Sequence, residues 1–144
     1  MKFYRTKQIL AALAFAALCS CAGDAFTAHK NSSTTTPLGK DWKVKTVMEG
    51  KASWYSVKTN SGTRTASGER LHNDAYTAAH KTLPMGTHVR VTNTSNGKSE
   101  ILRITDRGPY TRGRILDVTI GCAQRLGFYS RGIAPVKVEV LQPR

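Results

Sequence analysis

The sequence has 144 residues, which is room for one domain, and it carries 22 Lys and Arg against 9 Asp and Glu, a formal net charge of +13. A small chain with this charge is expected to have an anionic partner. Its 4 His and 3 Cys are scattered without the spacing of metal ligands, so we expect no metal and no other cofactor.

The chain begins with the pattern of an export signal. Residues 1–8 hold three basic side chains and no acid, and residues 9–18 (ILAALAFAAL) are continuously apolar. This apolar run is shorter than the roughly 20 residues that are needed to span a bilayer. We therefore expect residues 1–20 to be a signal peptide that is removed on export.

The end of this segment, Leu18-Cys19-Ser20-Cys21, resembles a bacterial lipobox with Cys21 as the acylated residue. An ordinary signal peptide with fortuitous cysteines is the alternative. Ala22 stands where a retention signal for the inner membrane would have Asp, which favours the outer membrane, facing the periplasm. The expected product is a lipoprotein that is anchored to the membrane by a palmitate-type lipid on Cys21.

Cleavage before Cys21 removes three basic residues and leaves 19 Lys and Arg against 9 Asp and Glu, a net charge of +10. The anionic partners outside the cytoplasm are cell-wall polymer and lipid phosphate, so we expect no nucleic-acid partner. Residues 21–48 have little apolar patterning and include the polar run NSSTTTP, which predicts a flexible tether. Residues 49–144 form the predicted globular domain, which we expect to be monomeric.

This domain is expected to be mainly β. Alternating or strand-like composition marks four segments, which are residues 88–92, 100–105, 114–118 and 136–141. Asn96-Gly97, between the first two, predicts a hairpin turn. A short helix is predicted after Thr119, a candidate N-cap, with Cys122 buried in it and Gly127 closing it. Short strands with one small helix favour a compact barrel over a layered α/β fold.

Three polar residues are candidates for chemistry, and each has a structural alternative. Glu69 follows a glycine in a polar run and is either a reactive loop acid or a solvated one. His80 is either a catalytic group or a structural histidine in a less polar stretch. Asp106 precedes Arg107-Gly108-Pro109, so it either builds a turn or is an acid held still where the chain leaves a strand.

Six motifs in register resemble the RlpA-like (rare lipoprotein A) family over residues 50–141. They are Gly-x-Ala-Ser-Trp-Tyr (50–55), Thr65-Ala66-Ser67-Gly68-Glu69, Thr77-Ala78-Ala79-His80, Leu83-Pro84-x-Gly86-Thr87, Asp106-Arg107-Gly108-Pro109-Tyr110 and Gly113-Arg114-x-x-Asp117. This resemblance implies a mainly β fold, a six-stranded double-psi β-barrel with one or two short helices. It also implies lytic transglycosylase activity, which cleaves peptidoglycan between N-acetylmuramic acid and N-acetylglucosamine and leaves a 1,6-anhydro end. Some members prefer glycan strands without stem peptides.

The catalytic residues proposed for the family correspond to Asp106, Glu69 and His80 here. Glycosidic cleavage needs a carboxylic acid to protonate the leaving oxygen while positive charge develops on the sugar. The muramic acid 6-hydroxyl is the nucleophile, so no enzyme nucleophile is required. We assign Asp106 as the acid and base, Glu69 as its partner or as a stabiliser of the charge, and His80 as a group that orients one of them.

This assignment places a condition on the neighbours of Asp106. A general acid must hold its proton near neutral pH, whereas a nearby Arg107 and a protonated His80 would favour the ionised carboxylate. The assignment therefore requires that Arg107 points elsewhere and that His80 is neutral, or that Glu69 lies close enough for the two carboxyls to share a proton. The sequence leaves open which carboxylate is protonated.

Six further residues are candidates for substrate binding. Two aromatic side chains, Trp54 and Tyr55, would stack on sugar faces, with packing in the core as the alternative. Three arginines would bind the lactyl carboxylate of peptide-free muramic acid, with a solvated basic face as the alternative. These are Arg107, Arg112 and Arg114, and the sixth candidate is Thr65, in the motif that contains Glu69.

Two other functions compete with catalysis. One is a non-catalytic peptidoglycan-binding or expansin-like, wall-loosening lipoprotein, because expansin-like proteins use the same barrel with similar acids. The other is a structural lipoprotein that recruits division proteins. No SPOR repeat, a peptidoglycan-binding module, follows the predicted barrel, so septal targeting through such a module is not expected.

Overall fold

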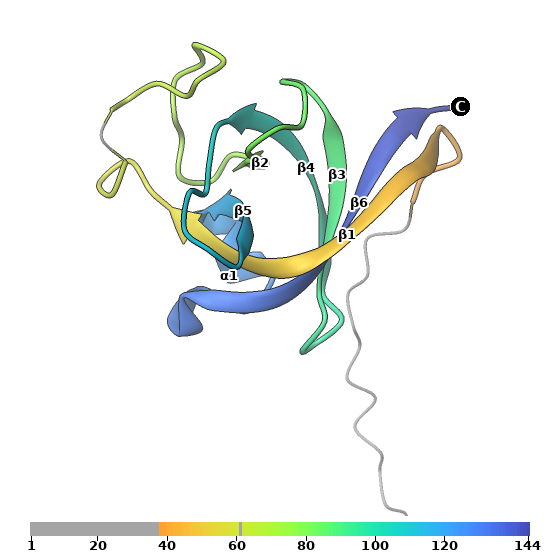
Figure 1. Ribbon diagram of the computed structural model, residues 1–144. Helices are drawn as coiled ribbons and strands as arrows, with labels where there is room; N and C mark the ends of the chain where they lie inside the picture. The colour runs from red at the N-terminus through yellow and green to blue at the C-terminus, as the bar shows by residue number, and fades with distance from the viewer. Residues whose placement is uncertain (1–37, 61) are drawn as a thin grey trace, which may run out of the picture. The chain divides into compact units, whose positions relative to one another are not determined.

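The computed structural model describes residues 38–60 and 62–144 (Figure 1). The predicted signal peptide, the lipidation site at Cys21 and the first part of the predicted tether lie outside these residues. Within the described ranges, no helix is long and apolar enough to cross a membrane.

Six strands close into a barrel in the order β1-β5-β2-β4-β3-β6. The elements are β1 (Trp42–Tyr55), β2 (Thr77–Ala79), β3 (His88–Asn93), β4 (Ser99–Asp106), β5 (Arg114–Thr119), α1 (Ile120–Arg125), the 3-10 helix η1 (Tyr129–Arg131) and β6 (Ile133–Pro143). The expectation of a mainly β, six-stranded barrel with one or two short helices is confirmed.

Two strand pairs in the barrel are parallel, β1 with β5 and β2 with β4, and the other neighbours are antiparallel. Parallel neighbours cannot be joined by a tight hairpin, so longer segments must cross between them. Parallel pairing also places the C-terminal ends of β2 and β4 at the same edge of the sheet. The residues that follow β2 and end β4 therefore meet.

The core of the barrel is built by alternation along the strands. Buried aliphatic side chains from β3, β4, β5 and β6 pack together with α1 and with Phe128, which is fully buried. The four predicted strands are all present, and Asn96-Gly97 lies in the turn between β3 and β4. Cys122 is buried in α1 as predicted, and burial is the main reason that the pKa of its thiol is raised.

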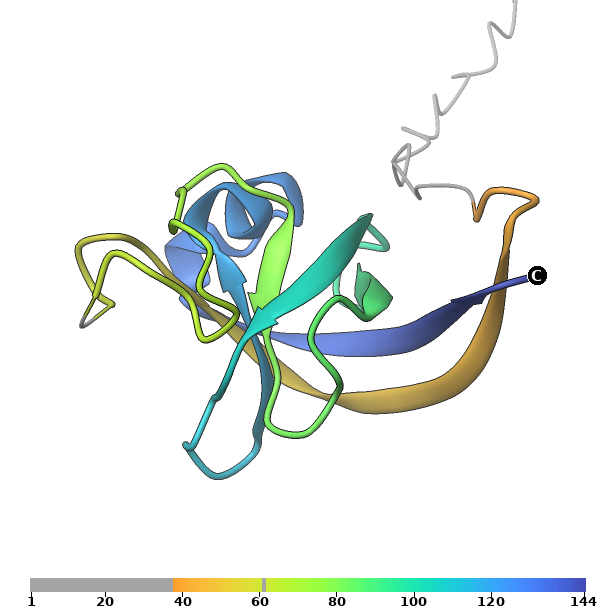
Figure 2. The ribbon, with the colours of Figure 1, turned by 90° about the horizontal axis from the view of Figure 1, so that it is seen from above.

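The barrel begins earlier than the sequence predicted. Trp42 pairs with Pro143 and Met48 with Val138, so residues 42–48 form the first half of β1 rather than the end of the tether. Figure 2 shows this half of β1 running beside β6. Most side chains there are exposed without alternation, which explains why the strand pattern was missed.

Thr119 occupies the N-cap position as predicted, but its side chain does not cap the helix. Instead, its hydroxyl donates to the carbonyl oxygen of Ala75 at 2.6 Å. The other end follows the prediction, because Gly127 adopts a positive φ of 73° just after the helix.

Candidate active site

The C-terminal ends of β2 and β4 bring His80 and Asp106 together. Ala79, the last residue of β2, pairs with Asp106, the last residue of β4. The next amide, that of His80, donates to the Asp106 carbonyl oxygen at 3.1 Å. The ladder is irregular at this point, because Ala78 pairs with Ile104 and Thr105 is left without a partner on β2. A bulge of this kind is common beside active sites.

The two oxygens of the Asp106 carboxylate have different surroundings. Oδ1 accepts hydrogen bonds from the backbone amides of Ala66 at 3.0 Å and Arg107 at 2.8 Å. Among the described residues, no hydrogen bond reaches Oδ2. Asp106 thus organises the local backbone through Oδ1, while Oδ2 has no hydrogen bond within the described residues.

The imidazole of His80 is held as a hydrogen-bond acceptor. Nδ1 accepts from the backbone amides of Thr82 and Leu83, both at 3.1 Å. Burial, and then the charges of Arg107 and Lys81, lowers the pKa of His80. The ring is therefore neutral with its proton on Nε2. Its described hydrogen bonds orient the loop after β2 and do not go to either carboxylate.

The guanidinium of Arg107 binds backbone carbonyls. Its Nη1 donates to the carbonyl oxygen of His80 at 3.1 Å and to that of Leu83 at 2.8 Å. None of its described hydrogen bonds goes to the side chain of Asp106. Arg107 thus binds the backbone of the His80 loop, and His80 is neutral. These two bonds use Nη1, one of the guanidinium nitrogens of Arg107 that were expected to bind the lactyl carboxylate of the substrate.

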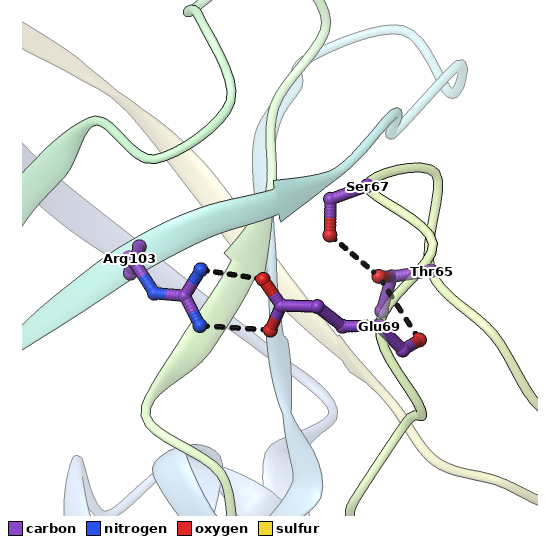
Figure 3. Close-up of polar contacts among 4 residues, drawn as sticks. All are labelled: Thr65, Ser67, Glu69 and Arg103. Carbon is purple, nitrogen blue, oxygen red and sulfur yellow. Dashed lines mark hydrogen bonds and ion pairs between the residues drawn. The ribbon is translucent and has the colours of Figure 1, made fainter.

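Glu69 forms a two-pronged ion pair with Arg103 of β4 (Figure 3). Oε1 accepts from Nη1 at 2.6 Å and Oε2 accepts from Nη2 at 2.8 Å. The Arg103 guanidinium holds the pKa of Glu69 below its usual value, so the carboxylate is ionised at neutral pH. The Glu69 side chain remains 45% exposed and open to a ligand. No described hydrogen bond joins it to Asp106 or His80.

The two aromatic candidates are engaged in packing. Trp54 packs against the core, donates from Nε1 to the carbonyl oxygen of Tyr129 at 3.2 Å and lies 5.0 Å from the Tyr129 ring, centroid to centroid. The hydroxyl of Tyr55 is buried. Burial, with a further contribution from the charge of Asp106, raises the pKa of Tyr55 to about 12. These contacts favour the core alternative for both residues.

The polar candidates for substrate binding differ in how free they are. Thr65 is buried, and its hydroxyl lies 3.0 Å from that of Ser67, which shapes the loop (Figure 3). Arg114 pairs with Asp117 at 3.4 Å. Arg112 is exposed and has no hydrogen bond or ion pair within the described part of the chain. It is the one of the three predicted arginines that is fully available to an anion.

Two residues that the sequence did not single out belong to this neighbourhood. Tyr110 is 79% exposed and follows the Gly108-Pro109 segment, so its ring is available to stack on a sugar. Tyr110 is the last residue of the motif that begins with Asp106, and this position was the signal by which the sequence could have identified it. Arg103 had a weaker signal, as a cation at an outward position of a strand. Among the described residues, no three His, Cys, Asp or Glu side chains are grouped to hold a metal.

A family model described as lytic transglycolase matches residues 47–138. The chain belongs to this family. It is 53% identical over 94 residues to the endolytic peptidoglycan transglycosylase RlpA of Neisseria meningitidis and 49% identical over 96 residues to that of Pseudomonas aeruginosa. The alignments cover 65% and 67% of this chain but only 39% and 28% of those relatives, so the chain spans about a third of their length. The predicted resemblance to the RlpA-like family is confirmed.

Solved structures show the same fold. The Streptomyces papain inhibitor has a TM-score of 0.55 at 18% identity, with 69% of this chain and 97% of the inhibitor covered. An expansin from Clavibacter michiganensis has a TM-score of 0.54 at 18% identity, with 67% and 51% covered. The double-psi barrel expected from the sequence is confirmed, and at this identity the likeness shows the fold alone.

Proposed function

We propose that the chain is a peptidoglycan lytic transglycosylase that cleaves the bond between N-acetylmuramic acid and N-acetylglucosamine and leaves 1,6-anhydro ends. The observation that carries this proposal is the carboxylate of Asp106, which is fixed through Oδ1 and whose Oδ2 has no described hydrogen bond, beside a neutral His80. The names of the aligned relatives support the substrate class.

The proposed reaction needs one acid–base group. Asp106 donates the proton on Oδ2 to the glycosidic oxygen as the bond to the muramic acid C1 breaks. The muramic acid 6-hydroxyl then bonds to C1, and Oδ2 takes its proton, so Asp106 returns to its starting state. Glu69, ionised and fixed by Arg103, stabilises the positive charge on the sugar and accepts hydrogen bonds from sugar hydroxyls. His80 holds the backbone around Asp106.

A preference for peptide-stripped strands fits two exposed groups on the segment between Asp106 and β5. Removal of the stem peptide leaves a lactyl carboxylate on each muramic acid, and Arg112 offers an exposed guanidinium that has no partner within residues 38–60 and 62–144. Tyr110 offers an exposed ring for a sugar face. In this proposal, both residues bind the glycan and neither takes part in proton transfer.

The test is to incubate the protein with intact and peptide-stripped glycan strands and to look for anhydro-ended sugars by mass spectrometry. Asp106→Asn keeps an Oδ1 acceptor for the two backbone amides but cannot transfer the proton, so turnover should fall about 10²- to 10⁴-fold. Asp74→Asn, at an exposed loop carboxylate, is the matched control and should keep full activity. Equal activity of Asp106→Asn and the wild type would refute the acid–base role.

The second candidate is a non-catalytic glycan-binding or wall-loosening module. It is favoured by the fold shared with a Clavibacter michiganensis expansin, a mutant of which has been solved in complex with cellohexaose. If the wild type yields no anhydro ends but still sediments with glycan, this candidate replaces the enzyme.

We also propose a lipoprotein anchored in the outer membrane through Cys21, on the sequence pattern described above. Labelled palmitate should enter the wild type and not Cys21→Ala, and the wild type should fractionate with outer membranes. Release of both proteins into the soluble fraction would rule the anchor out.

A further inference from the structure

The loop before β2 is fastened to β4 at successive positions. Glu69 binds Arg103 through their side chains, and the amide of Ser67 donates to the carbonyl oxygen of Thr105 at 3.0 Å. The amide of Ala66 donates to the carboxylate of Asp106 at 3.0 Å. The loop therefore runs antiparallel to the strand, and the Arg103 pair lies at one end of a line of contacts that reaches the Asp106 carboxylate at the other.

Residues 65–69 form a turn that is closed by its own hydrogen bonds. The amide of Thr65 donates to the carbonyl oxygen of Glu69, and the amide of Gly68 donates to that of Thr65, both at 2.9 Å. Arg64 adds a bond from its guanidinium to the Gly68 carbonyl oxygen at 2.7 Å. Gly68 has a φ of +87°, which the tight turn requires. A displacement of Glu69 is therefore passed on to Ala66.

A contribution to the stability of the fold does not by itself explain why Arg103 and Glu69 form an ion pair. Both side chains are substantially exposed, at 38% and 45%, and exposed ion pairs usually contribute little to folding. The geometry, in contrast, is specific, because a planar guanidinium fixes both carboxylate oxygens at once. Such a pair is suited to setting the position and ionisation of Glu69.

We propose that Arg103 is a positioning residue for the glycan-cleaving site: its fork holds Glu69 and, through the turn 65–69, keeps the Ala66 amide on Oδ1 of Asp106. This inference rests on the proposed function. Arg103 acts through Glu69 and Ala66 and contacts neither the scissile bond nor the transferred proton.

The charge of Arg103 also keeps Glu69 ionised. Its hydrogen bonds are the main cause of the lowered pKa of Glu69, and the Ser67 hydroxyl has a smaller effect in the same direction. The other charged groups nearby are Arg64 and Arg70, which flank the turn on its own loop, and the guanidinium of Arg64 is bound to Gly68. Without Arg103, the pKa of Glu69 returns toward its ordinary value.

The experiment compares Arg103→Gln and Arg103→Lys with the wild type in pH–rate profiles on peptide-stripped strands. Arg103→Gln should lower kcat by about 10²-fold, as misplacement of a catalytic group does. It should also move the acid limb of the profile to higher pH. Arg103→Lys keeps the charge without the fork, so it should lower kcat while leaving the acid limb near its wild-type position.

The matched control is Arg90→Gln. Arg90 pairs with Glu139 at 2.6 Å between β3 and β6, and its described contacts include no residue of the turn. Removing it breaks an ion pair of the same length in the same barrel but leaves the contacts of the turn in place, so kcat and the acid limb should stay unchanged at a temperature where the variant is folded. Wild-type kcat and an unshifted profile in Arg103→Gln would overturn the inference while leaving the proposed function intact.

Amide hydrogen exchange tests the same inference without turnover. In Arg103→Gln, the amides of Ala66 and Ser67 should exchange at least about tenfold faster than in the wild type, because local opening becomes easier. In Arg90→Gln they should not change. If the wild type releases no anhydro sugars, the proposed function fails, and exchange alone then decides whether Arg103 holds the turn. Unchanged exchange in Arg103→Gln would overturn that role.

Discussion

At the scale of single residues, one ring nitrogen of His80 holds the backbone that follows it, because it accepts hydrogen bonds from two amides. Nδ1 binds two amides, from Thr82 and Leu83, and a proton on this nitrogen would remove both bonds. Burial and the charges of Arg107 and Lys81 lower the pKa of His80 in the folded protein. Neutral histidine is therefore part of the folded structure as well as a condition of the proposed mechanism.

A pH dependence of stability follows from this lowered pKa. The unfolded chain takes up a proton on His80 below about pH 6.5, whereas the folded protein resists it down to the lowered value. His80 therefore stabilises the fold above about pH 6.5, and this stability is lost as the pH falls toward the folded-state pKa, by at most about 1.4 kcal/mol per pH unit. His80→Asn offers an amide oxygen in place of Nδ1 but does not titrate.

Urea unfolding of both proteins between about pH 7.5 and pH 5 measures the effect. The wild type should lose stability relative to His80→Asn over this window. Parallel curves would show that the His80 pKa is the same in the folded and unfolded states.

The predicted site residues show what a sequence can and cannot reveal. The six motifs predicted that Asp106, His80 and Glu69 share one site, because the order of these motifs matches that of the RlpA-like family. The roles of individual atoms were not accessible, because they depend on backbone amides brought in from distant loops. The ion pair of Glu69 with Arg103 joins residues 34 positions apart, which no local pattern indicates.

At the scale of secondary-structure elements, an ion pair joins side chains of β3 and β6 in addition to their backbone ladder. Arg90 and Glu139 are cross-strand partners, and Nε of Arg90 donates to Oε2 at 2.6 Å. The Glu139 side chain is largely buried, and its hydrogen bond with Arg90, aided by Lys137, lowers the pKa of its carboxyl. Its folded-state pKa therefore lies below its unfolded value.

Glu139→Gln should destabilise the protein by about 2 kcal/mol at neutral pH, because a charge-assisted hydrogen bond becomes a neutral one. The stability from the ionised carboxylate is complete above the unfolded pKa and is lost as the pH falls through the lower folded pKa. The difference between the two proteins should therefore shrink toward pH 3 or so. Glu49→Gln, at an exposed position of β1, should behave like the wild type in the same urea titrations. A difference that persists unchanged in acid would contradict the assignment.

The elements that the sequence missed share a physical cause. Residues 42–48 of β1 are exposed on both faces, so they show no period of two. Strand β2 has three residues, all buried, and is too short to show any period. Thr119 fits the pattern of a helix cap, but the carbonyl of Ala75 competes successfully for its hydroxyl. Tertiary contacts decided each case, and only local pattern was visible in the sequence.

At the scale of the whole molecule, the excess of basic residues predicts salt-sensitive binding. Lys and Arg outnumber Asp and Glu by 22 to 9 along the chain, and Arg112 is exposed without a described partner. Exposed charges are screened over about 10 Å at 0.1 M salt and over about 3 Å at 1 M. Binding to an anionic glycan through such groups must therefore weaken as salt rises.

Co-sedimentation with peptide-stripped strands should fall several-fold between about 0.1 M and 1 M salt. Arg112→Gln should bind less at low salt and show a weaker dependence on salt, whereas Arg131→Gln, at another exposed position, should follow the wild type. Binding that does not respond to salt would remove the arginine from the proposed glycan contact.

Thr105, which has no partner on β2, has a consequence for the direction in which the carboxylate of Asp106 faces. Leu102 and Ile104 point into the core, and strict alternation would turn Asp106 to the same side. The bulge interrupts that alternation: Thr105 is buried and Asp106 is partly exposed. One additional residue in the strand thus rotates a carboxylate out of an aliphatic interior and toward the loop whose amide it binds.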